Sequence, residues 1–321
     1  MFLMRFAMRS DTTDPDMRAA LYAGAIEMCD WAEGRGAVAA VFSQHHAADD
    51  GYLPSPIPLA AAVASRTKEL PISVAALLLA LYEPVKLAED MAVVDLISRG
   101  RVSYVVGIGY RPEEFDMFGV DRRRRAAIVE DRISLLQRLW RGETVDVDGR
   151  LVRITPPPFT PGGPMLVYGG GSEAAARRAG RLGLPFLAET HDSTLEAAYR
   201  AEGGSSAPGC FFPPSGTPLT LFVADDPERA WADIGEYLLL DAVSYAHWNV
   251  GRGGVASLSQ ASTVAELGAE KGAYQIVTPD EARELIHSGF PLNLQPLVGG
   301  LPPDLAWPYL EAAAAVSTSL L

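Results

Sequence analysis

Two adjacent histidines, His45 and His46, are the first residues of this sequence that could do chemistry. They end the stretch AVAAVFSQHH, an apolar run closed by Gln44, in a chain with 5 histidines. An imidazole titrates near neutral pH and suits proton transfer at the end of a strand. A structural role at a polar rim is the alternative. No HxH or HxxxH spacing or Cys/His cluster completes a metal site, and no GxSxG motif marks a nucleophile.

A glycine-rich segment, YGGGSEAAARRAG, is the second candidate. Gly170 and Gly171 let backbone N–H groups approach a ligand, and Ser172 can cap a following helix whose positive end faces the loop. Arg177 and Arg178 add positive charge one turn later. Phosphate binding and an ordinary capped strand–helix turn are equally supported by these residues. The segment has neither a Walker ending nor GxGxxG spacing.

Small residues follow two further apolar runs. Ala75 and Ala76 lie in one, and Gly107, Gly109 and Tyr110 end the other. Such glycines turn the chain or leave room for a planar ring, and the turn is the more common reason. Together with the histidines and the glycine-rich loop, these strand ends are typical of a site for a flat, phosphorylated cofactor.

The elements that must position these residues alternate along the chain. Apolar runs of strand length are separated by helical patterns, which predicts parallel strands covered by helices. Eight such units favour a (β/α)8 TIM barrel, with a doubly wound open sheet as the alternative, and barrel sites lie at the C-terminal ends of strands. The predicted strands are Phe2–Met8, Val38–Ser43, Ile72–Leu79, Val102–Ile108, Met165–Tyr168, Phe186–Ala188, Leu219–Ala224 and Leu292–Val298.

Three segments interrupt the repeat, near 142–163, 202–216 and 248–271. The first contains an Asp148-Gly149 turn between apolar residues, which predicts a small hairpin. The third is rich in Gly, Ser and Ala and precedes the last predicted strand, so we expect a lid-like insertion there. We predict one domain over 1–321.

Composition excludes several classes of protein. The formal net charge of −13 disfavours nucleic-acid and anionic-membrane binding. No apolar stretch approaches the length of a membrane span, and Cys29 and Cys210 form no disulfide framework. We therefore expect a cytoplasmic protein. The basic run Arg122–Arg125 is expected on a solvated helix face.

A longer set of landmarks resembles one family. The stretches QHH…PSPIPLAAAVASRT, EPVKLAEDMAVVDLISRGRV and VGIGYRPEEFDMFGVD, followed by GGPMLVYGGGSEAAARRAG, are similar to the bacterial-luciferase-like flavin-dependent oxidoreductases. The resemblance covers about two-thirds of the chain and fades across 202–271. It implies a TIM barrel with an insertion, a homodimer, and FMN or the deazaflavin F420 as cofactor.

The resemblance also implies roles for residues. His45, with His46 beside it, matches the family's catalytic Glu-His-His motif. The remaining matches concern the flavin: a non-proline cis peptide behind its ring, glycines bordering the ring, and a phosphate contact. The corresponding residues are Ala75 and Ala76, then Gly107 and Gly109, then Ser172. Tyr110, Gly170 and Gly171, at the same strand ends, complete the predicted cofactor site.

This sequence departs from the family at three places. The helix after Ser172 lacks the second hydroxyl found in luciferase, so the phosphate contact is expected to rest on backbone amides and Arg177. Gln44 replaces the acid of Glu-His-His, which should leave imidazole protonation less favoured, and Gly107-Ile108 replaces a Cys-Arg pair of the luciferase α chain. Light emission is therefore not expected.

The leading interpretation is a monooxygenase that uses O2 and reduced FMN from a separate reductase, with a small organic substrate under the lid. The alternatives are F420-dependent hydride transfer, a non-catalytic flavin-binding protein, and a flavin-free barrel that binds a sugar phosphate. The last leaves the landmarks unexplained.

Overall fold

The computed structural model describes the chain except residues 191, 207–208, 212–217, 251–258, 290 and 320–321. Within the described residues, nine strands form one parallel sheet in the order β10-β9-β11-β1-β2-β3-β4-β7-β8. Its strands are β1 (Phe2–Phe6), β2 (Ala37–Phe42), β3 (Ile72–Leu78), β4 (Val102–Gly107), β7 (Leu166–Gly170), β8 (Phe186–Ala188), β9 (Thr220–Val223), β10 (Tyr274–Val277) and β11 (Leu292–Leu294).

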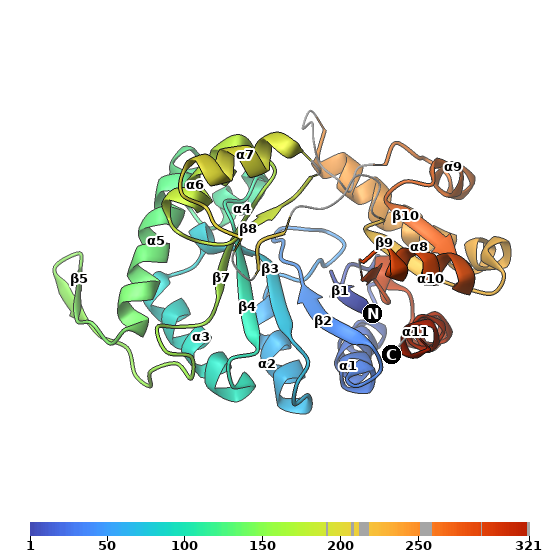
Figure 1. Cartoon of the computed structure of the whole chain (residues 1–321), viewed down its shortest axis with the longest axis horizontal. Helices are drawn as coiled ribbons and strands as arrows, with labels where there is room; N and C mark the ends of the chain where they lie inside the picture. Colours follow the sequence, from blue (N-terminus) through green and yellow to red (C-terminus); the bar gives the residue numbers. More distant parts are fainter. Residues whose placement is uncertain (191, 207–208, 212–217, 251–258, 290, 320–321) are drawn as a thin grey trace.

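Helices surround this sheet (Figure 1). They are α1 (Pro15–Ala32), α2 (Pro56–Arg66), α3 (Pro84–Ser98), α4 (Pro112–Met117), α5 (Arg125–Trp140), α6 (Glu173–Arg181), α7 (Ser193–Ala201), α8 (Pro227–Trp248), α9 (Val264–Glu270), α10 (Pro279–His287) and α11 (Pro303–Thr318). Short 3₁₀ turns, η1 (Leu79–Leu81), η2 (Arg122–Arg124) and η3 (Val298–Gly300), connect some of them. Each predicted strand coincides with an observed one to within a few residues.

The seam of the barrel differs from a bare eightfold repeat. Eight strands follow chain order around the barrel, and β10 is a ninth that pairs with β9 on the edge away from β11. In the described residues β8 and β10 are the edge strands, and β8 pairs with Phe211. β10 and α10 therefore separate the predicted lid segment from the last strand, β11. β10 was not predicted, because its 4 residues form too short an apolar run.

The irregular segments contain some regular structure. The predicted hairpin is present as β5 (Val145–Val147) paired with β6 (Arg150–Val152), and it projects from the barrel in Figure 1. The third segment contains α9, which begins where the Thr263 side chain accepts a hydrogen bond from the Glu266 backbone. Residues 251–258 of that segment lie outside the described residues.

Local signals explain where the helices begin. Pro opens α1, α2, α3, α4, α8, α10 and α11 in the first turn, where its missing N–H costs nothing. Asp14, Asp226 and Thr278 cap their helices with side-chain oxygens. Helix α5 is an exception, because no side chain caps it and no acid lies in its first turn.

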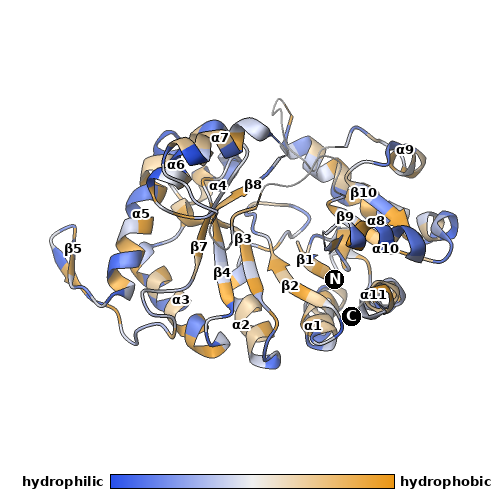
Figure 2. Cartoon of the chain, in the orientation of Figure 1, coloured by the Kyte–Doolittle hydropathy of each residue, from blue (hydrophilic) through white to orange (hydrophobic). Residues whose placement is uncertain are grey.

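The core lies between the strands and the inner faces of the helices. Figure 2 shows apolar residues along the strands and polar patches on the outer helices. Phe2, Met4 and Phe6 alternate with half-buried residues along β1, so successive side chains point to the helix layer and to the barrel interior. The C-terminal ends of the strands therefore hold the residues that the sequence singled out.

Candidate active site

His45 forms a buried ion-pair contact with Glu114. The Nδ1 atom of His45 lies 2.8 Å from Glu114 Oε1, and the same oxygen accepts a hydrogen bond from the His46 backbone N–H at 2.8 Å. Glu114 comes from α4 and is fully buried, while His45 is 8% exposed. The carboxylate that the Gln44 substitution removes is thus supplied by a different element.

This contact determines which nitrogen of His45 carries the proton. A carboxylate accepts hydrogen bonds, so the proton lies on Nδ1 and the Nε2 atom keeps its lone pair. Burial lowers the pKa of His45, and the hydrogen bond and charge of Glu114 oppose this shift. Glu114 Oε2 is buried and has no hydrogen-bond partner among the described residues. The pair can therefore accept a proton at Nε2 and stabilise the imidazolium that results.

Aromatic side chains surround the His45 ring. Tyr52, Tyr110 and Trp248 each meet it edge to face, with ring centroids 4.9, 5.4 and 5.0 Å away. Tyr52 also donates to, or accepts from, the Tyr245 hydroxyl at 2.7 Å. These walls limit water at His45 and fit a flat ring better than a charged group.

Two arginines hold the end of α8 against this cluster. The guanidinium carbons of Arg9 and Arg111 lie 4.4 and 4.1 Å from the Trp248 ring centroid. Arg9 is 1% exposed and pairs with Asp50 at 2.7 Å and Asp241 at 3.1 Å. Arg111 donates to the backbone oxygen of His46. The cations therefore join the loops after β1, β2 and β4 to helix α8.

His46 has a neutral partner instead of a carboxylate. Its Nε2 atom lies 2.7 Å from Gln44 Nε2, and its ring meets Phe118 edge to face at 4.7 Å. Burial lowers the pKa of His46. His45 thus contacts a carboxylate, which accepts hydrogen bonds, whereas His46 contacts an amide nitrogen, which donates them. The local sequence does not show this difference.

Three of the predicted ring-binding residues lie side by side. The Ala75–Ala76 peptide bond is cis, and the pairing of β3 with β4 shifts register between Ala75 and Leu77. A Cβ atom built on Gly107 would lie 2.9 Å from Ala76 Cβ. Gly109 has a φ of +71° and faces Phe115. Both glycines thus have packing reasons of their own, besides any ring they border.

The glycine-rich loop lies at the end of β7, and two strands, β3 and β4, separate β7 from the strand that precedes the histidine pair. Ser172 is exposed, and its hydroxyl accepts a hydrogen bond from the Ala175 backbone at the start of α6. Gly171 is close to Glu189, whose Oε2 would lie 2.9 Å from an added Cβ. Arg177 pairs with Glu173 and Glu202 along the helix surface, so it does not face the loop.

Exposed cations precede α5, a helix that an ion pair joins to α6. Residues Arg122, Arg123 and Arg124 are exposed in η2, at the start of α5. Arg178 of α6 pairs with Glu130 of α5, each on the second turn of its helix.

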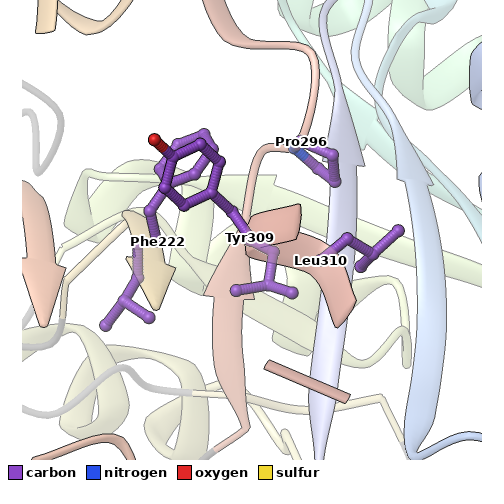
Figure 3. A pocket seen from close by; sticks show the side chains of 6 residues that line it. Phe222, Pro296, Tyr309 and Leu310 are labelled. Atoms are coloured by element: carbon purple, nitrogen blue, oxygen red, sulfur yellow. The ribbon is translucent and has the colours of Figure 1, made fainter. Parts of the chain in front are cut away.

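Two small cavities have linings that include none of these residues. Figure 3 shows one between β9, β11 and α11, lined by Phe222, Pro296, Tyr309 and Leu310 among others. Its volume of ≈ 10 Å³ holds about one water molecule. This cavity is too small for a substrate.

Metal-ion sites and membrane-spanning helices are two other features that the described residues lack. The described ranges contain no group of three or more His, Cys, Asp or Glu side chains placed to share a metal ion. No helix in the described part of the chain has the length and apolar character to cross a bilayer.

Sequence reasoning missed several residues of this site. Glu114 and Arg111 had no assigned role, and Tyr52 and Trp248 were not singled out. One signal was present: in PEEF the buried acid, Glu114, directly precedes the buried Phe115, whereas Glu113 is exposed. A buried carboxylate needs a partner, and His45 is that partner.

Two solved structures share the fold along the whole chain. Monooxygenase RslO1 from Streptomyces bottropensis has a TM-score of 0.74 and 22% identity, and covers 100% of this chain and 99% of its own. The oxygenating constituent of 3,6-diketocamphane monooxygenase from a Pseudomonas putida plasmid, in complex with FMN, has a TM-score of 0.72 and 18% identity, over 100% and 99%. These likenesses confirm the predicted barrel fold.

One curated relative is the oxygenase component of a flavin-dependent trigonelline monooxygenase from Acinetobacter baylyi. It is 27% identical over 145 residues, which is 44% of this chain and 40% of that protein. The chain thus aligns with less than half the length of the curated relatives it matches. Residues 3–288 match the family described as luciferase-like monooxygenase, and the chain belongs to that family.

Proposed function

We propose that the protein is a flavin-dependent monooxygenase that uses reduced FMN and O2 on a small organic substrate. One observation carries the proposal: a buried His45–Glu114 pair whose imidazole ring is surrounded by Tyr52, Tyr110 and Trp248. Membership of the luciferase-like monooxygenase family supports it, as does a fold neighbour in complex with FMN. Bound reduced FMN would supply the electrons that activate O2.

The protein's own residues would manage the proton. His45 Nε2 accepts or returns it, and Glu114 holds the ring orientation and stabilises the charged form through Nδ1. Tyr52, Tyr110 and Trp248 exclude water around that atom, which strengthens the electrostatic effect of the carboxylate. His46 is the second candidate catalytic residue.

The residues at the mouth fit a flavin ring. The Ala75–Ala76 peptide and Gly107 bring backbone and small side chains together, so a planar group can approach the barrel wall there. Tyr110 and His45 offer the edges of aromatic rings beside that wall. Gly109 completes the set that we assign to the ring.

The outer part of the mouth fits a phosphate. We assign it to the backbone N–H groups near Gly170, Gly171 and Ser172 at the start of α6. The nearby Arg122–Arg124 run adds positive charge in a protein with net charge −13. Cations near a helix N-terminus destabilise the helix by about 0.3–1 kcal/mol each. Helix stability therefore does not explain the Arg122–Arg124 run.

Partners follow from the proposed chemistry. A separate reductase would deliver reduced FMN. The relative from Acinetobacter baylyi is the oxygenase component of its monooxygenase, which supports this arrangement. We propose a cytoplasmic homodimer, supported by three exposed apolar residues on one helix, α3: Val93, Leu96 and Ile97. Light scattering at several protein concentrations measures this assembly.

Flavin titration tests the function. We expect the purified protein to bind reduced FMN under anaerobic conditions, and to consume O2 with a substrate when a reductase and NADH are added. Binding of F420 without FMN would replace the proposal by deazaflavin hydride transfer. Flavin binding without turnover by any substrate would favour a non-catalytic binding protein. Failure to bind any flavin would overturn all three and leave a flavin-free barrel.

A further inference from the structure

The orientation of the Gln44 side chain is set by an unambiguous donor. The Leu78 backbone N–H points at Oε1 of Gln44, with the nitrogen and oxygen 2.9 Å apart. A backbone N–H can only donate, so the atom facing it must be the amide oxygen. The amide NH2 group of Gln44 therefore points the other way, toward His46 and the Tyr82 hydroxyl. Gln44 is 2% exposed, and this arrangement is fully enclosed by protein.

The amide nitrogen then determines the state of His46. Gln44 Nε2 lies 2.7 Å from His46 Nε2 and 2.8 Å from the Tyr82 hydroxyl oxygen, with the Pro54 oxygen at 3.2 Å. An amide NH2 donates and never accepts. His46 Nε2 must therefore carry a lone pair, because a proton there would place two donors face to face. A neutral imidazole with a bare Nε2 carries its proton on Nδ1.

The surroundings of His46 agree with a neutral ring. The charged and titratable groups facing it are Glu114 and Arg111 from the α4 region, and His45 beside it. Burial lowers the pKa of His46, His45 and Arg111 act in the same direction, and Glu114 opposes them. Burial also raises the pKa of Tyr82 to about 12, so its hydroxyl stays intact as an acceptor.

The Nδ1 atom of His46 is available to a ligand. Within the described part of the chain it makes no hydrogen bond, and it is absent from the fully buried unpaired atoms. The ring is 9% exposed and rests edge to face on Phe118 at the rim. A fixed N–H at the mouth of a flavin site suits a carbonyl oxygen, which needs a donor when it leaves water.

We propose that Gln44 is a positioning residue that fixes His46 as the neutral imidazole protonated on Nδ1, and that His46 donates this hydrogen to a carbonyl oxygen of the flavin ring. The first half stands on the hydrogen-bond geometry alone, and the second half rests on the proposed function. The two neighbouring histidines then divide the work. His45, backed by Glu114, exchanges a proton, and His46, backed by Gln44, keeps one.

Nitrogen-15 NMR of the histidine side chains tests the first half without any ligand. In the wild-type protein at pH 7, we expect His46 to show an unprotonated Nε2 and a protonated Nδ1, assigned by comparison with His46→Asn. In Gln44→Glu a carboxylate replaces the amide, so we expect a proton on Nε2 and a higher pKa for His46. The matched control is Gln275→Glu, which adds the same charge on β10, where the native amide bonds backbone oxygens.

A wild-type spectrum with the proton on Nε2, or a cationic His46 at pH 7, would overturn the proposal. An unchanged His46 in a folded Gln44→Glu variant would do the same. If Gln44→Glu does not fold, Tyr82→Phe serves instead. It removes the other short acceptor of the amide, and we expect the His46 tautomer to persist.

Flavin binding tests the second half. His46→Leu removes the donor, and His46→Asn keeps an N–H near the Nδ1 position. We expect His46→Leu to bind reduced FMN about three- to tenfold more weakly, and His46→Asn to stay near the wild-type affinity. Equal affinity for His46→Leu and wild type would overturn the donor role. Absence of FMN binding by the wild-type protein overturns the proposed function, while the tautomer assignment is decided by its own spectrum.

Discussion

The two sides of the barrel mouth are built differently. On the β2–β4 side, His45, His46, Gln44 and Glu114 are each less than a tenth exposed and bond to one another across three strand ends. On the β7 side, the loop ending in Ser172 is exposed, and its capping oxygen bonds its own helix.

This difference separates two jobs of a cofactor site. Enclosed groups that hold each other in place can direct a proton, because water and side-chain motion no longer compete with the reacting atoms. An exposed loop beside cations can attract and seat a charged tail, and it works through charge more than through exact geometry. The closed side should therefore control turnover, and the open side should control affinity.

The strongest way to break this comparison is Glu114→Gln. The change keeps the shape of the side chain and removes the charge that stabilises protonated His45. We expect kcat to fall about 10²–10⁴-fold, the range for loss of general acid–base assistance, with little change in the Kd for reduced FMN. Stopped-flow kinetics and flavin titration measure the two quantities separately.

Glu113→Gln is the matched control for that change. Glu113 is the neighbouring acid on α4 and is exposed. Its replacement by Gln removes the same single negative charge. We expect its kcat to stay within about twofold of wild type, as for a surface substitution. A folded Glu114→Gln enzyme that turns over as fast as Glu113→Gln would remove the carboxylate from the mechanism.

The open side is tested through charge. Replacing Arg122 and Arg124 together by Gln should weaken reduced-FMN binding about tenfold at low salt, and less at high salt where charges are screened. The control pair is Arg150→Gln with Arg153→Gln, at the exposed hairpin that projects from the barrel (Figure 1). Isothermal titration at two ionic strengths compares them. Equal losses in the two double variants would mean that net charge alone matters.

Much of the fold could be predicted because its signals are local. Apolar runs, opening prolines and capping side chains place the strands and helices without knowledge of the partner elements. β10 was missed because Tyr274–Val277 is a four-residue strand whose identity depends on pairing with β9. α8 continues as far as Trp248, and its last turn brings that side chain against His45, a contact that no local pattern indicates.

The site was predictable only in part for the same reason. The His45-His46 pair and the loop before Ser172 are visible as local motifs. The contact between His45 and Glu114 joins residues 69 positions apart, and that between Gln44 and Leu78 spans 34. The sequence therefore identified the histidines, and tertiary structure alone shows that one faces a carboxylate and the other an amide.

The smallest expected effect is a loss of folding stability in mild acid, which comes from the buried histidines on the closed side of the mouth. The pKa values of His45 and His46 are lowered by burial in the folded protein, so the unfolded chain binds protons near pH 6.5 that the folded chain does not. Stability is therefore fully present above pH 6.5 and falls as the pH decreases below it, by at most about 1.4 kcal/mol per pH unit for each histidine.

Guanidinium unfolding between pH 7.5 and 5 measures this slope. Glu143 and Asp121 are surface acids whose pKa values are lowered by hydrogen bonds that involve arginines. Their contribution to the free energy of unfolding is lost only as the pH falls below about 4.5. This lower pH window does not overlap the upper window, in which the histidines titrate. His46→Asn should reduce the slope in the upper window while leaving the lower window unchanged, because in the described residues the buried imidazoles are those of His45 and His46. A slope that survives in the double variant His45→Gln with His46→Asn would place the acid-sensitive groups elsewhere in the protein.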